Sequence, residues 1–172
     1  IDPRAMRGEA YDLFNTAHPF TGIHITETGL DYLEQYMAEC RAEVGYEIPL
    51  AIDHLGHIPV EDCIKLGKRL EKFNLAWMED PVPWQYTDQY VRMANATTTP
   101  LGTGEDIYLK ENFMPLLKSG ALAVVHPDIL TAGGILETKK IGDLAEYYHT
   151  AMAIHMAESP IACMGAVHVA AA

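Results

Sequence analysis

LAIDH at residues 50–54, LAWMEDP at residues 75–81 and LGTGED at residues 101–106 each place an acid at or near the end of a short apolar run. The acids Asp53, Glu79 and Glu105 follow one another at equal intervals of 26 residues. An interval of this length holds one strand, one helix and two loops, and parallel βα units bring successive strand ends to the same edge of a sheet. The spacing therefore predicts three converging carboxylates, which is an arrangement typical of a divalent-metal site.

Short apolar runs alternate with helix-like stretches along the rest of the chain, as parallel strands buried on both faces do. Five such units in series predict an α/β fold: a parallel (β/α) TIM-type barrel, only partly present, with its functional face at the C-terminal ends of about five strands. A doubly wound sheet is the alternative, although no Gly-rich phosphate loop follows the first strand. The expected strands are 49–53, 75–79, 100–104, 121–125 and 151–155, and the expected helices are 30–44, 60–73, 87–96, 109–118 and 134–148.

Two regions are expected along the chain. Residues 1–28 are rich in Gly, Pro, Asn, Thr and His and predict a long loop that could act as an active-site lid. Residues 29–172 form the partial barrel domain. An open parallel sheet would leave two unpaired edges and an exposed apolar face, so we expect the chain to be a portion of a longer protein.

Composition excludes several classes of function. The 172 residues are 49% hydrophobic, which suffices for the core of about one domain. The 24 acidic against 12 basic residues give a formal net charge of −12, which argues against nucleic-acid or anionic-membrane partners. No apolar run approaches the roughly 18 residues of a membrane span, and the N-terminal residues lack a signal-peptide segment. Three widely spaced cysteines indicate reduced thiols and a cytoplasmic protein.

The three carboxylates suit Mg²⁺, which prefers a few oxygen ligands in near-octahedral geometry and keeps some waters. Any one of these acids could instead cap a helix or remain solvated, and it is the equal spacing that favours a metal site. Asp80 and Asp106 directly follow two of the acids and, by strand alternation, are expected to point away from the barrel interior. Trp77 is expected to be a packing residue.

A second group follows on the next two units, HPDILTAGGI at residues 126–135 and AMAIHMAESP at residues 151–160. Neighbouring strands would bring the Asp128 carboxylate close to the His155 ring, where it would fix the tautomer and make the imidazole a stronger base. Such a pair can remove a proton. A core histidine bonded to a backbone carbonyl is the alternative for His155.

In order along the chain, the EDP motif at residues 79–81, the GED motif at residues 104–106 and the PD and GG pairs of residues 127–134 resemble the enolase superfamily. The similarity is to its mandelate racemase/muconate lactonizing enzyme-like branch, which includes acid-sugar dehydratases, and it runs from about residue 30 to the C-terminus. The resemblance implies that Asp53, Glu79 and Glu105 bind Mg²⁺. It also implies that His155 and Asp128 form the general base. Family members carry an N-terminal capping domain and eight barrel strands, which this sequence does not contain.

The resemblance implies abstraction of the proton α to the carboxylate of a hydroxy or sugar acid, followed by β-elimination of water. The expected protein is therefore a hydro-lyase whose partner is a small-molecule carboxylate, and a homo-oligomer. A racemase, epimerase or cycloisomerase that uses the same enolate is one alternative, and a catalytically silent sugar-acid-binding barrel is another. Weaker candidates for substrate binding are His54, His57, His126 and Glu158.

Overall fold

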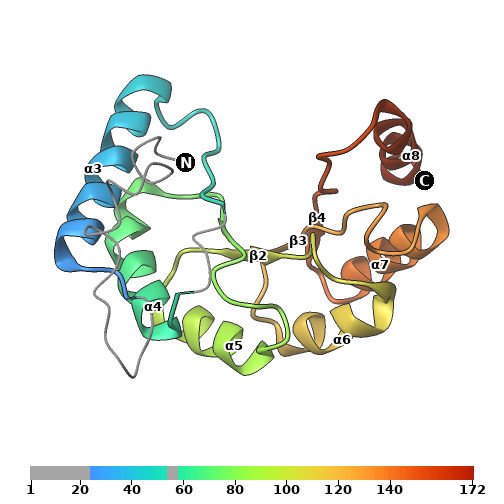
Figure 1. Cartoon of the computed structure of the whole chain (residues 1–172), viewed down its shortest axis with the longest axis horizontal. Helices are drawn as coiled ribbons and strands as arrows, with labels where there is room; N and C mark the ends of the chain where they lie inside the picture. Colours follow the sequence, from blue (N-terminus) through green and yellow to red (C-terminus); the bar gives the residue numbers. More distant parts are fainter. Residues whose placement is uncertain (1–23, 54–57) are drawn as a thin grey trace.

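Four parallel strands form the sheet in a computed structural model that describes residues 24–53 and 58–172 (Figure 1). Their order in the sheet is the order along the chain, β1-β2-β3-β4. Each crossover therefore adds a strand on the same side of the previous one, whereas a doubly wound sheet reverses direction at a switch point. The α/β class and the barrel-type winding are confirmed, and the doubly wound alternative is wrong. The strands are β1 (Met78–Glu79), β2 (Leu101–Thr103), β3 (Val124–Val125) and β4 (Ala151–Met152).

The strand expected at residues 49–53 is present only as a single bridge, between Ile52 and Met78. The backbone N–H of Glu79 donates to the carbonyl of Ile52 at 2.9 Å, and that of Ala76 donates to the carbonyl of Leu50 at 2.8 Å. This segment therefore lies parallel to β1 at one edge of the sheet. The other strands also span two or three residues instead of the five predicted, although bridging resumes between Asp128 and His155 beyond β3 and β4.

Helices follow the strands and contact one another in sequence order. Figure 1 shows α4 to α7 in a row along one side of the strands, with α3 and α8 at the two ends of the arc. Buried side chains of the strands, such as Met78 and Val125, pack in one core with helical residues such as Leu66 and Ile141. The helices are α3 (Glu27–Val44), α4 (Val60–Leu70) with the 3₁₀ turn η1 (Glu71–Phe73), α5 (Thr87–Ala96), α6 (Leu109–Ser119), α7 (Ile135–Tyr147) and α8 (Pro160–Ala170).

Local capping explains where several helices begin and end. The Thr26 side chain accepts a hydrogen bond from the N–H of Gly29, so α3 begins three residues earlier than predicted. Gly120 ends α6 in a left-handed conformation, which glycine adopts without steric cost. Thr87 is the first residue of α5, and no side chain caps that helix. Helix α8 was not predicted, although Ser159 at its N-cap and Pro160 at its first position are typical of a helix start.

Two further expectations concern the chain as a whole. Cys40, Cys63 and Cys163 are free thiols. None of the helices within residues 24–53 and 58–172 has the length and apolar composition that a membrane crossing requires. Most of the expected lid lies outside the described residues, and its last two residues, 27 and 28, already belong to α3.

Candidate active site

The polar residues singled out in the sequence gather at the C-terminal edge of the sheet. Glu79 is the last residue of β1, and Asp53 directly follows the bridge at Ile52. Asp128 and His155 form their own parallel bridge beyond β3 and β4. Because all strands run in the same direction, these side chains share one rim, as the spacing predicted.

Asp53 and Glu79 lie close together, and the third acid beside them is Asp80. Each of the three offers a carboxylate oxygen, and these atoms all lie within 4.8 Å of one another. Asp80 was expected to point away from the barrel interior, outside the set of metal ligands, but its carboxylate oxygen lies with those of Asp53 and Glu79. Its φ of 43° lies in the left-handed region, so the alternation of side chains along an extended strand does not apply to it. Asp106, by contrast, is exposed.

Glu105 does not belong to that group. Its Oε2 atom lies 3.0 Å from Nε2 of His155, so it pairs with the imidazole. Burial raises the pKa of Glu105, and the charges of Asp53 and Glu79 add to this effect while His155 opposes it. The structure thus brings together two of the three predicted metal ligands, and a metal-binding role for Glu105 stays a prediction from sequence.

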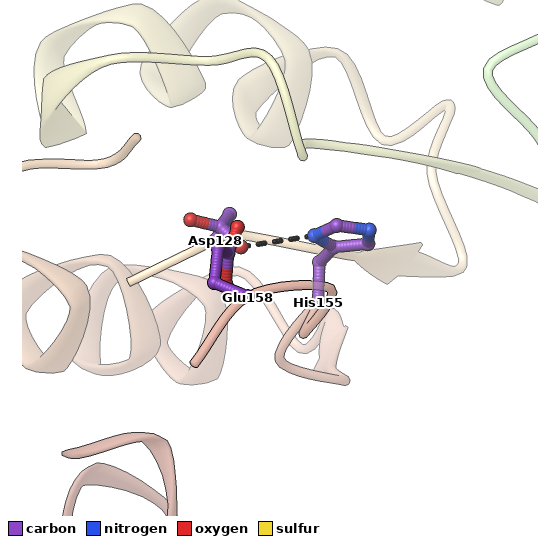
Figure 2. A group of neighbouring side chains, drawn as sticks. All are labelled: Asp128, His155 and Glu158. Carbon is purple, nitrogen blue, oxygen red and sulfur yellow. Dashed lines mark hydrogen bonds and ion pairs between the residues drawn. The ribbon is translucent and has the colours of Figure 1, made fainter. Parts of the chain in front are cut away.

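His155 and Asp128 form the predicted pair, shown in Figure 2. Nδ1 of His155 and Oδ2 of Asp128 are 2.9 Å apart. The other oxygen of Asp128, Oδ1, accepts hydrogen bonds from the backbone N–H groups of Leu130 at 2.8 Å and Thr131 at 3.0 Å. Both oxygens of this buried carboxylate are therefore engaged, and the carboxylate fixes the orientation of the imidazole ring.

The electrostatics of the pair favour an imidazole that readily accepts a proton. Burial opposes ionisation of Asp128, but the hydrogen bonds from His155 and from the N–H of Thr131 outweigh it and hold the pKa of Asp128 below its ordinary value. Burial likewise opposes the charged form of His155. The hydrogen bond to Asp128 and the charge of Glu105 outweigh that effect and raise the pKa of His155.

Glu158 lies beside the same pair in Figure 2, in the segment that leads into α8. Ligand atoms of Asp128, His155 and Glu158 lie within 4.8 Å of one another. A hydrogen bond with the Asp128 carboxylate raises the pKa of Glu158. The Glu158 side chain is exposed at the rim, and its proposed contact with substrate stays a prediction.

Two aromatic residues surround Glu79. The indole Nε1–H of Trp77 donates to Oε2 of Glu79 at 2.7 Å. Nε2 of His126 lies 3.7 Å from the same oxygen, and its Nδ1 lies 3.2 Å from the carbonyl of Ala153. His126 is only 4% exposed, so here it faces Glu79 rather than open solvent, and its expected contact with substrate stays untested. The polar role of Trp77 was missed, although its place two residues before Glu79 puts both on one strand face.

His54 and His57 were the remaining candidates for substrate binding. They lie outside the described residues.

Comparisons with known proteins come from both sequence and structure. The profile of a family described as Enolase C-terminal domain-like matches residues 7–172. A D-xylonate dehydratase from Haloferax volcanii is 33% identical over 149 residues, covering 87% of this chain and 36% of its own length. A D-galactonate dehydratase from Ralstonia nicotianae is 32% identical over 148 residues, covering 86% of this chain and 39% of its own length. The chain therefore spans less than two fifths of these curated relatives.

A solved structure shows the same likeness in three dimensions. The 3,6-anhydro-D-galactonate cycloisomerase from Zobellia galactanivorans superposes with a TM-score of 0.78 at 34% identity. The matched region covers 83% of this chain and 40% of that one.

Proposed function

The chain belongs to the enolase C-terminal domain-like family, and we propose that it forms catalytic barrel units of an acid-sugar dehydratase. The membership confirms the resemblance that the ordered motifs indicated. Two relatives whose names specify dehydration of sugar acids align with 86–87% of the chain, which supports the reaction class. The proposed substrate class is a sugar acid that carries a hydroxyl group on its β-carbon, next to the α-carbon that loses the proton.

We propose that the carboxylates of Asp53 and Glu79 hold a Mg²⁺ ion. They fit this ion because their oxygens and that of Asp80 lie within 4.8 Å of one another, and Mg²⁺ takes oxygen ligands. Two residues are candidates for the third protein ligand. The motifs indicate Glu105, whereas the distances between carboxylate oxygens favour Asp80. When bound, the ion would act as a Lewis acid and lower the energy of the enolate.

His155 is the proposed general base. Asp128 holds Nδ1 of the ring, so the proton taken from the substrate would be received by Nε2. The imidazolium that results would lie between two carboxylates, Asp128 on one side and Glu105 at 3.0 Å on the other. Departure of the β-hydroxyl as water then needs a proton donor, a role that we propose for His54 or His57, which follow Asp53 in the sequence.

The 2.9 Å contact between His155 and Asp128 carries this proposal, because a base with an orienting carboxylate is needed for proton abstraction and not for binding alone. The full chain should be incubated with Mg²⁺ and a panel of aldonic and aldaric acids that includes D-xylonate and D-galactonate. We expect a 2-keto-3-deoxy product from at least one acid and loss of turnover in His155→Asn. Binding of an acid without turnover or α-proton exchange would instead support the silent binding barrel.

An isomerase is the second candidate, because the cycloisomerase from Zobellia galactanivorans is 34% identical to the chain and the two dehydratases are 33% and 32% identical. Both reactions share the enolate but differ in its fate. In D₂O, an isomerase or racemase would incorporate deuterium at the α-carbon without net loss of water. A dehydratase would release water and give the keto acid.

A further inference from the structure

Glu79 accepts a hydrogen bond from Trp77, a residue that neither the motifs nor the proposed chemistry require. The indole N–H of Trp77 donates to Oε2 of Glu79 at 2.7 Å, which is a short and well-formed hydrogen bond. Trp77 lies two residues before Glu79, so the two side chains project from the same face of one strand. A donor on one oxygen restricts rotation of the carboxylate and leaves its second oxygen available to a cation.

The Trp77 ring is itself fixed. Its centroid lies 5.1 Å from that of His126, with the two planes tilted by 42°. The His126 ring cannot move away easily, because its Nδ1 lies 3.2 Å from the carbonyl of Ala153 and the side chain is buried. The indole of Trp77 and the imidazole of His126 therefore pack against each other next to Glu79.

The neighbouring strand β2 leaves room for His126 because it carries glycine where a side chain would clash. A Cβ atom at Gly102 would lie 2.7 Å from Nε2 of His126, closer than any van der Waals contact allows. At Gly104 a Cβ atom would lie 2.7 Å from the backbone nitrogen of the same residue. Gly102 in β2 thus leaves room for the His126 ring, and Gly104, directly after the strand, leaves room for the His126 backbone.

We propose that Trp77 is a positioning residue of the metal site, which orients Glu79 through its indole N–H and is braced by His126. This inference rests on the proposed function, since it assigns Glu79 to a divalent cation. Groups that hydrogen-bond a metal ligand from outside commonly change metal affinity by about 10–100-fold when they are removed. Trp77→Phe removes the N–H and keeps an aromatic ring in the same place.

The test measures metal binding instead of turnover. Mn²⁺ affinity of the full chain is determined by electron paramagnetic resonance for the unaltered protein, Trp77→Phe, Glu79→Gln and the matched control Trp84→Phe. Trp84 packs against the core and makes no contact with Glu79 among the hydrogen bonds of the described residues. We expect the Mn²⁺ affinity of Trp77→Phe to fall by about 10-fold or more and that of Trp84→Phe to stay unchanged. The melting temperatures of the two variants should be similar.

Tryptophan fluorescence gives a second readout, because Trp77 and Trp84 are the only two tryptophans. In Trp84→Phe the emission of Trp77 should change on titration with Mg²⁺, and in Trp77→Phe the emission of Trp84 should not. An affinity of Trp77→Phe within twofold of the unaltered protein would overturn this inference alone, provided that Glu79→Gln binds weakly. If Glu79→Gln also binds Mn²⁺ normally, the proposed metal site itself is wrong.

Discussion

Replacement of Asp128 by asparagine should invert the proton positions on the His155 ring. In the structure Oδ1 of Asp128 accepts from the N–H groups of Leu130 and Thr131, while Oδ2 faces Nδ1 of His155. An asparagine can keep both backbone hydrogen bonds only if its oxygen takes the Oδ1 position. Its amide N–H₂ must then face Nδ1, which becomes an acceptor, so the ring proton moves to Nε2.

The strength of this preference follows from the two backbone hydrogen bonds. A flipped amide would lose both, at about 0.5–1.5 kcal/mol each, which favours the inverting orientation by about 5-fold to 150-fold. A ring protonated on Nε2 cannot take a proton from substrate with that atom. The same change beside a general-base histidine lowers kcat by about 10⁴-fold where the geometry is kept. We expect a smaller loss here, about 5-fold to 150-fold, because the orientation preference leaves a minor population with the productive tautomer.

The pH dependence of kcat separates a wrong tautomer from a simple change in basicity. Loss of the Asp128 charge alone would lower the pKa of His155 and move the acidic limb to lower pH, while the plateau at high pH would be kept. The wrong tautomer lowers kcat at every pH. Asp143→Asn, which makes the same chemical change on the surface of α7, is the control. A plateau at high pH equal to that of the unaltered protein would refute the tautomer argument.

Three further predictions concern neighbouring residues. The charge of Glu105 raises the pKa of His155, so Glu105→Gln should move the NMR titration of the His155 ring to lower pH; a titration that stays in place would contradict the contact. Asp80→Asn should weaken Mn²⁺ binding if distance identifies the third ligand, and Glu105→Gln should weaken it if the motifs do, as measured by calorimetry. Gly104→Ala should lower the free energy of unfolding by about 3 kcal/mol in urea denaturation because its methyl group meets backbone atoms, whereas Gly120→Ala, with open space, should cost only about 1–2 kcal/mol.

The sequence could predict those features that depend on regular repetition. Parallel strands bring their C-terminal ends together whatever the details of the loops, so Asp128 and His155 were correctly paired from their positions on adjacent units. The same regularity gave the bounds of α5 without error and those of α7 within one residue.

Features that depend on individual backbone angles or side-chain rotamers could not be predicted in this way. Asp80 joins Asp53 and Glu79 because its φ is positive, which breaks the alternation assumed for a strand. The flexible side chain of Glu105 adopts a rotamer that pairs its carboxylate with the imidazole of His155. Helix α8 was missed because its residues are mostly small and apolar on every side, so no amphipathic period marks it.

The proposed function requires that a divalent ion held by Asp53 and Glu79 lies next to the His155 and Asp128 pair. Paramagnetic broadening of histidine ring signals by Mn²⁺ tests this most directly, with the His155 signal assigned by its loss in His155→Asn. We expect Mn²⁺ to broaden the His155 signal at low occupancy, while exposed His168 at the end of α8 stays sharp and Glu79→Gln abolishes the effect. A His155 signal that stays sharp while Mn²⁺ binds the protein would show that the ion does not lie beside His155.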